Sequence, residues 1–208
     1  TLLCFLPFAQ VVLFAGTTAL WLLWGVYLVS SADIGSYTDP TTGFSVAVLS
    51  FDVHCKRAIL FLALGWFWSI ALIEAMGQLV SSHSVAHWYF AAERSDINSM
   101  TVLRSIRHMT RYHLGTAAIG SLIIALFRVV RISFEFLKAR LKSKRIVQNC
   151  VLKIPLCIAS CMLWFLERVL KFLNKHAYIQ CAMFGTSFFT SARFAFKLIV
   201  RNLGRTAA

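Results

Sequence analysis

One long stretch without a charged residue constrains the fold of this chain more than any other feature. From Leu2 to Val29 there are 28 residues and none is Lys, Arg, Asp or Glu. The hydrocarbon core of a bilayer is about 30 Å thick and takes about 20 helical residues to cross. Trp21, Trp24 and Tyr27 lie toward the end of the stretch, where an aromatic belt meets the headgroups. The stretch predicts a transmembrane helix over residues 2–29.

The distribution of charged residues divides the chain near residue 93. Residues 1–92 carry two basic and four acidic side chains, a net charge of −2, whereas residues 93–208 carry nineteen basic and four acidic side chains, a net charge of +15; the sum is the total of +13. Hydrophobic residues make up 59% of the chain and charged residues only 14%, too apolar for a soluble domain of this length. An apolar half followed by a basic half is typical of a membrane protein whose spans give way to a cytoplasmic face.

The basic residues of the second half stand between long apolar runs. A protein that binds DNA or RNA keeps a soluble core and displays its Lys and Arg on the surface. We therefore expect no nucleic-acid partner, and anionic lipid headgroups as the counter-charge. Because the chain begins at Thr1 and enters apolar sequence at once, we also expect it to be an internal fragment of a longer protein.

A second span follows a polar connection. Residues 30–57 predict an extracytoplasmic loop, because Asp, Gly and Pro punctuate it and residues 30–54 contain no Lys or Arg. Residues 58–92 are then apolar except for Glu74 and a polar cluster over residues 78–84. This run is long enough for one tilted helix or for a helix that is broken near Gly77. It predicts a span that enters from the outside and ends at the cytoplasmic face.

Residues 93–208 predict a basic, membrane-associated helical region of the same domain. The apolar runs 114–127, 154–166 and 177–192 are short and flanked by Lys or Arg, which favours interfacial or re-entrant helices over spans. A first charged stripe consists of Arg104, Arg107 and Arg111 and marks the cytoplasmic face, with about 1 kcal/mol of headgroup attraction per residue. A second stripe, from Arg128 to Lys142, points another way, so we expect a helix break near Gly115 or Gly120.

Four residues of the second span are candidates for binding an organic cation. Glu74 is an ionisable group inside a span, which is costly and usually faces a cavity or a partner. Trp68, Trp88 and Tyr89 offer π-faces, which hold a quaternary ammonium because this cation has no N–H to donate. The alternatives are a structural salt bridge for Glu74, and packing or interfacial belt positions for the aromatic residues.

Other reactive residues favour structural roles. His83 and His87 are four residues apart, but no Cys or carboxylate lies on the same turn, so we predict polar packing and no metal site. The six cysteines are irregularly spaced and fit buried or acylated residues better than a disulfide framework. No nucleophile elbow, phosphate loop or catalytic dyad is present, so we expect neither an enzyme nor a cofactor.

Seven blocks of the chain form a specific pattern. They are Gly65-Trp66-Phe67-Trp68, Gly77-Gln78, Ala86-His87-Trp88-Tyr89-Phe90, Arg111-Tyr112-His113-Leu114-Gly115-Thr116, Gly120-Ser121-Leu122-Ile123-Ile124-Ala125, Phe172-Leu173-Asn174-Lys175-His176-Ala177-Tyr178-Ile179 and Thr190-Ser191-Ala192-Arg193. In their order and separation these blocks resemble the choline transporter-like family, solute carrier family 44, and the resemblance runs from about Leu2 to Arg205.

The resemblance implies a polytopic α-helical carrier that moves choline or a related organic cation. It also implies that the remaining helices of a full-length transporter are partners of this chain in transport. It implies the plasma membrane, with an organelle membrane as the alternative. Trp68, Trp88 and Tyr89 fall on matching positions of the family, whereas Glu74 is a candidate on its own chemistry.

Two functional hypotheses follow. The first is transmembrane transport of choline or a related organic cation. The alternative is a non-transporting membrane scaffold that binds anionic lipids through basic amphipathic helices. Both predict an all-α polytopic membrane protein, with transmembrane helices followed by basic amphipathic, interfacial or re-entrant helices.

Overall fold

Helices make up nearly all of the chain. The computed structural model describes residues 2–38, 43, 45–92, 100–143 and 150–206. The elements in chain order are the 3₁₀ helix η1 (Leu2–Phe5), α1 (Leu6–Ser30), β1 (Asp33–Thr38), β2 (Ser45–Ser50), α2 (Val53–Phe90), α3 (Thr101–Tyr112), α4 (Leu114–Ser143), α5 (Cys150–Phe184) and α6 (Phe188–Thr206). The predicted all-α class is confirmed.

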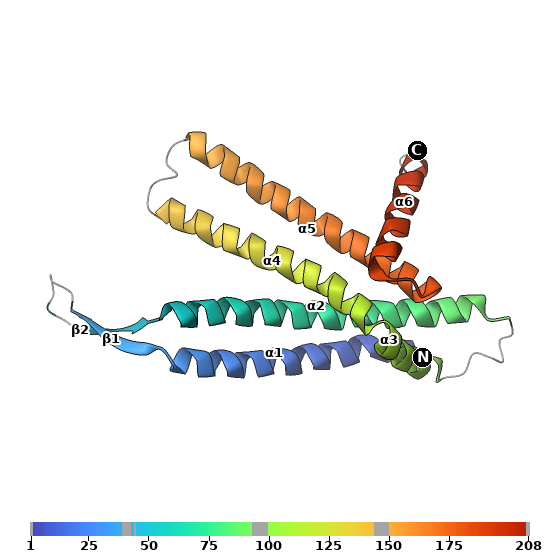
Figure 1. Cartoon of the computed structure of the whole chain (residues 1–208), viewed down its shortest axis with the longest axis horizontal. Coiled ribbons are helices and arrows are strands. Elements are labelled where there is room, and N and C mark those ends of the chain that lie inside the picture. The colour runs from blue at the N-terminus through green and yellow to red at the C-terminus, as the bar shows by residue number, and fades with distance from the viewer. Residues whose placement is uncertain (1, 39–42, 44, 93–99, 144–149, 207–208) are drawn as a thin grey trace.

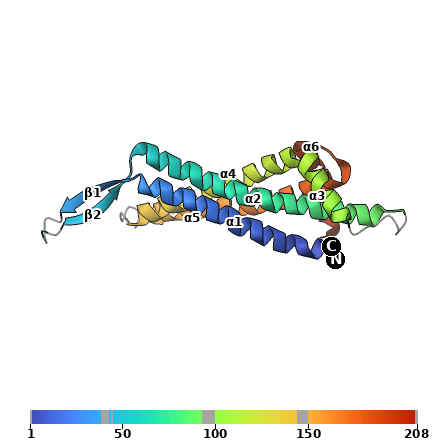
Figure 2. The ribbon, with the colours of Figure 1, turned by 90° about the horizontal axis from the view of Figure 1, so that it is seen from below.

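Helices α1 and α2 lie antiparallel and side by side along the longest dimension of the molecule (Figures 1 and 2). Polar side chains join them at two levels: Gln10 Nε2 donates to the Ile73 carbonyl at 3.3 Å, and Trp21 Nε1 donates to Ser69 Oγ at 3.2 Å. Helix α2 runs unbroken through Gly77, whose missing side chain leaves the space that Gln10 occupies. The unbroken helix, and not the helix broken near Gly77, is therefore the correct alternative for the second apolar run.

The connection between α1 and α2 contains a β-hairpin that the sequence analysis did not predict. Strands β1 and β2 pair antiparallel from Asp33 opposite Ser50 to Thr38 opposite Ser45. The β-branched residues Val46 and Val48 favour a strand, but one apolar segment of six residues is too short to be distinguished from a loop by pattern alone. Helix α2 also begins earlier than predicted. The sequence analysis began the apolar run at residue 58, after Lys56 and Arg57, whereas the helix begins at Val53 and carries these two basic residues exposed on its first turns.

Residues 114–127 belong to a longer helix than the sequence analysis predicted. They begin the 30-residue helix α4, and Leu114–Leu141 is long and apolar enough to be a candidate membrane span, as are Leu3–Ser30 and Val53–Phe90. The sequence analysis ended the run at Phe127 because Arg128 and Arg131 interrupt the apolar pattern, whereas the helix continues through them. The break expected near Gly115 is confirmed, since α3 ends at Tyr112 and α4 begins at Leu114, while Gly120 lies inside α4.

Run 154–166 and the start of run 177–192 belong to α5, a 35-residue helix that packs along α4. Helix α5 ends at Phe184. The next residue, Gly185, has a φ of 67° and donates its backbone N–H to the Cys181 carbonyl at 2.8 Å. Glycine is preferred in this left-handed capping position because it lacks a Cβ. The chain then turns into α6, which crosses the end of α5 (Figure 1).

Small residues bring the helices together where α2, α4 and α5 meet. The buried core holds Ala75, Ala117, Ala177 and Ala182 around Leu79, Met109, Tyr178 and Phe188. Gly120 of α4 lies against Tyr178 and Phe188, and its carbonyl accepts a hydrogen bond from Asn174 Nδ2 at 2.8 Å. Close approach of helix backbones over small residues, with polar side chains bonded across the interface, is how helices associate in membranes.

The C-terminal end of α4 and the N-terminal end of α5 lie at the same end of the molecule as the β-hairpin, and α3 lies at the opposite end (Figures 1 and 2). Exposed basic residues occur at both ends, with Arg140 near the hairpin and Arg104 on α3. The distribution of Lys and Arg therefore does not by itself assign a side of the membrane to the hairpin. Its extracytoplasmic location stays a prediction.

Single cysteines test whether α4 crosses the membrane. In a full-length protein without other reactive cysteines, Ser50→Cys and Arg140→Cys should react with an impermeant maleimide from one side, and Arg104→Cys from the other. A permeant maleimide should label all three. Reaction of Arg140→Cys and Arg104→Cys from the same side would show that α4 does not cross.

Gly120→Ala should destabilise the protein because its Cβ would collide with Tyr178 and Phe188. Overpacking of this kind costs about 1–3 kcal/mol, so the midpoint of thermal unfolding should fall. The matched control is Gly115→Ala on the same helix, where an added Cβ meets nothing within 4 Å. Equal midpoints for the two variants would contradict the close packing of α4 on α5.

Candidate substrate groove

The four predicted substrate residues do not form one site. Trp68 and Trp88 are twenty positions apart on the unbroken helix α2, which corresponds to about 30 Å along its axis. Trp68 Nε1 donates to the Ala118 carbonyl of α4 at 3.2 Å. Trp88 and Tyr89 are 60% and 73% exposed near the end of α2. A single small cation cannot touch both tryptophans, so the residues must be considered separately.

Glu74 lines a cavity of about 310 Å³ between α1, α2 and α5. Gln10 contributes from α1, the polar residues Gln78, Ser81 and Ser82 from α2, and Lys175 and Ile179 from α5. Glu74 is the only acidic residue among the described lining residues, and it forms no ion pair within 4.0 Å in the described part of the chain. Sites for small ligands typically measure about 300–1,000 Å³ and contain a few polar groups.

A second, more apolar groove continues from this cavity toward the end of α2. It measures about 400 Å³, shares Ser81, Ser82 and Ile179 with the first cavity, and is lined further on by Tyr89 and Phe90. Glu74 and Tyr89 therefore lie along one continuous groove between α2 and α5. Trp68 and Trp88 line neither part.

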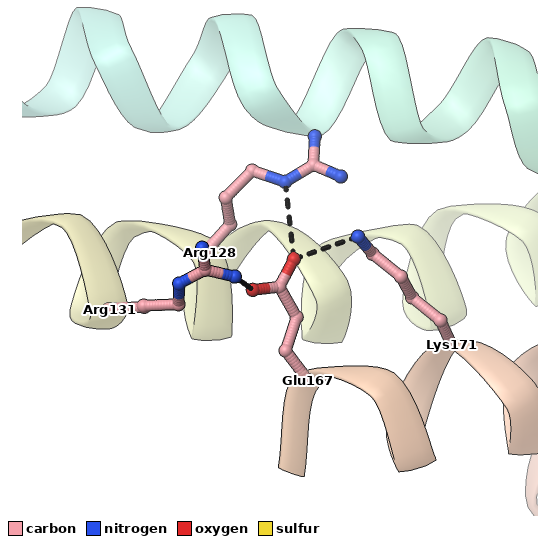
Figure 3. Close-up of polar contacts among 4 residues, drawn as sticks. All are labelled: Arg128, Arg131, Glu167 and Lys171. Atoms are coloured by element: carbon pink, nitrogen blue, oxygen red, sulfur yellow. Dashed lines mark hydrogen bonds and ion pairs between the residues drawn. The ribbon is translucent and has the colours of Figure 1, made fainter. Parts of the chain in front are cut away.

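The most strongly bound acidic group is Glu167 of α5, which the sequence analysis did not single out. Its side chain is 6% exposed and bonds to Arg131 Nη1, while Lys171 Nζ lies 2.8 Å and Arg128 Nε 3.8 Å from Oε1 (Figure 3). Figure 3 shows the Arg128 side chain extending from α4 toward α2, where its guanidinium lies 5.6 Å from the centre of the Phe67 ring. One buried carboxylate thus connects α4 and α5, and through Arg128 reaches α2.

Glu167 also affects the charge near Glu74. Lys171 lines a small cavity beside Glu74, but its ammonium is held by Glu167 one helical turn away. The carboxylate of Glu74 is therefore not neutralised by Lys171. The i, i+4 spacing of Glu167 and Lys171 indicates their ion pair from the sequence alone. The ion pairs of Glu167 with Arg128 and Arg131 depend on how α4 packs on α5.

The three arginines of the first charged stripe lie exposed on α3, and their location at the cytoplasmic face stays a prediction. Arg104, Arg107 and Arg111 are all exposed on α3, whereas Ser105 and Met109 on the same helix are buried. This face is free to contact lipid headgroups.

Histidines gather where α2, α3 and α4 meet. His83 Nδ1 lies 2.9 Å from Ser105 Oγ, and the His83 ring stacks on His108 with 5.2 Å between ring centres. His113, between α3 and α4, contacts Cys181 Sγ at 3.3 Å; burial lowers its pKa, and the nearby His108 lowers it further. Among the described residues, no group of three or more His, Cys, Asp or Glu could hold a metal ion.

Comparison with known proteins identifies the family. The model of a family described as plasma-membrane choline transporter matches residues 1–208. The chain belongs to the choline transporter family. It is 39% identical over 145 residues to choline transporter-like 2 of Anopheles gambiae and 38% identical over 173 residues to choline transporter-like protein 2 of Mus musculus. It is 31% identical over 207 residues to choline transporter-like protein 2 of Dictyostelium discoideum.

These matches cover 70%, 81% and 98% of this chain but only 18%, 24% and 31% of the three relatives. The chain is thus an integral membrane segment of a choline transporter family protein, with the all-α polytopic fold that the resemblance implied. Membership of a transporter family also agrees with the expectation of a transporter rather than an enzyme.

Removal of the buried acid should lower the stability of the protein. Glu167→Gln leaves Arg128, Arg131 and Lys171 without their counter-charge, and because the side chains of Arg131 and Lys171 are 39% and 46% exposed, solvent screening limits the cost to about 1.5–3 kcal/mol. The measurement is thermal unfolding of the purified full-length protein. Glu135→Gln is the matched control, since Glu135 is half exposed and its ion pair among the described residues is with Lys138 at 3.6 Å. Similar midpoints for the two variants would show that the Glu167 cluster does not stabilise the fold.

Proposed function

We propose that this chain forms part of the path by which a membrane carrier moves choline or a related organic cation, in the plasma membrane. The observation that carries the proposal is the position of Glu74 in a polar cavity between α1, α2 and α5, without a counter-ion among the described residues. Membership of the choline transporter family supports the substrate class.

The chemistry of the groove suits a quaternary ammonium. Such a cation cannot donate a hydrogen bond, so it is held by an opposite charge and by π-faces. Glu74 supplies the charge, and Tyr89 and Phe90 supply aromatic faces in the adjoining part of the groove. Lys175 also lines the cavity, but it is exposed, and its long side chain lets the ammonium reach water.

The path runs along α2 in this proposal. The cation pairs with Glu74, whose side chain is exposed at the cavity, passes the hydroxyls of Ser81 and Ser82, and reaches Tyr89 at the end of the helix. The remaining helices of the full-length protein complete the walls, as carriers alternate access around a site near the bilayer midplane. Trp68 and Trp88 stay predictions as substrate residues, and their positions fit packing against α4 and an interfacial belt.

Uptake of radiolabelled choline into transporter-null cells tests this function. Glu74→Gln in the full-length protein keeps the size of the side chain and removes its charge, so choline uptake should fall at least about tenfold, the equivalent of about 1.4 kcal/mol. Glu135→Gln, which removes a carboxylate outside the groove, should retain normal uptake. Unchanged uptake by Glu74→Gln at normal surface expression would contradict the proposal.

We also propose that α3 holds anionic lipid headgroups through Arg104, Arg107 and Arg111. This role is compatible with transport, because it uses the exposed face of α3 and leaves the groove free.

A further inference from the structure

The cluster around Glu167 holds more positive charge than its carboxylate neutralises. Arg128, Arg131 and Lys171 are three cations against one carboxylate, so two positive charges remain. Glu74 lines a small cavity together with Lys171, but it forms no ion pair within 4.0 Å in the described part of the chain. Even when Glu74 is counted, one positive charge is left without an acidic partner among the described residues.

The two arginines have unused hydrogen-bond donors. Arg128 Nε lies 3.8 Å from Glu167 Oε1, which is too far for a hydrogen bond, and its guanidinium lies 5.6 Å from the centre of the Phe67 ring. None of its five N–H donors bonds to a described residue. Arg131 bonds to Glu167 through Nη1 alone. Two adjacent guanidinium groups with free donors fit a further carboxylate, which accepts two parallel N–H bonds from an arginine.

The cations form the open side of the cluster. The side chains of Arg128, Arg131 and Lys171 are 24%, 39% and 46% exposed, whereas that of Glu167 is 6% exposed. We call these three residues the cationic face. A partner that approaches from outside the described helices therefore meets positive charge first.

The cationic face lies deep within a candidate span. Arg128 is fourteen residues from Leu114 and thirteen from Leu141, the two ends of this span, which corresponds to about 20 Å along the helix axis in either direction. Ionised side chains inside a span almost always face the interior of a helix bundle and are paired there. This depth favours a side chain of another helix over a lipid headgroup as the counter-charge.

A large part of the relatives lies outside the matched region, because the matches cover only 18%, 24% and 31% of their lengths. We propose that the cationic face docks another transmembrane helix of the full-length protein, and that this helix carries an Asp or Glu that pairs with Arg128 and Arg131. Neither arginine lines the groove that contains Glu74 and Tyr89. The inference therefore does not rest on the proposed function.

Cross-linking with dicyclohexylcarbodiimide, which enters membranes, tests the contact in the purified full-length protein. The reagent joins a carboxylate to an adjacent amine through an amide bond and takes up the released water as a urea. Arg128→Lys and Arg131→Lys each place an amine at the cationic face. Mass spectrometry of the digested protein should find these amines joined to an Asp or Glu outside residues 1–208. Arg140→Lys, an exposed position on the same helix, should give no cross-link to that acid.

Thermal unfolding provides a second readout whose sign separates the two cases. With a docked carboxylate, Arg128→Gln leaves that carboxylate unpaired, so the midpoint should fall by at least about 2 °C. Without one, the same variant removes an uncompensated charge from a span, and the midpoint should rise. Arg140→Gln should leave it unchanged.

Two results would overturn the docking surface. One is a set of cross-links confined to Glu167 and other acids of residues 1–208, as expected if a lipid phosphate holds the cationic face. The other is a midpoint for Arg128→Gln that rises or does not change. Both leave the choline uptake of the proposed function unaffected.

Discussion

The structure depends on the compensation of charge inside helices that are otherwise apolar. Arg128 and Arg131 lie within the third segment long enough to span a membrane, and an ionised group there is costly unless it is paired. Glu167 supplies the pairing from α5, with Lys171 as a third cation. The same contacts fix α4 against α5, and Arg128 extends the cluster to Phe67 of α2.

This charge compensation also leaves the negative charge in the candidate groove available. Because Glu167 binds Lys171, this cation of α5 does not neutralise Glu74. A few small residues set the shape of the space around it. Gly77 makes room for Gln10, and Gly120 lets Tyr178 approach the backbone of α4. The way the helices cross therefore determines the shape of the groove, and Glu74 places a negative charge at one point along it.

The sequence predicted features that depend on one helix at a time. The helix over the uncharged run from Leu2 to Val29 and the break near Gly115 follow from local composition, and the structure confirms them. For the second apolar run the sequence left one helix or a helix broken near Gly77 as alternatives, and the structure has one helix. Features that depend on two helices were missed. Arg128 and Arg131 read as the end of an apolar run because their partner, Glu167, lies 36 or more residues away. Glu74 was recognised as an unusual charge, but its neighbours in the cavity come from α1 and α5.

The position of the bound cation is the most direct test of this account. An electron cryo-microscopy structure of the full-length protein in saturating choline should show density for the ammonium beside Glu74, in the cavity shared with Gln10 and Ser81. Density against Trp68 or Trp88 alone, with the Glu74 cavity empty, would contradict it.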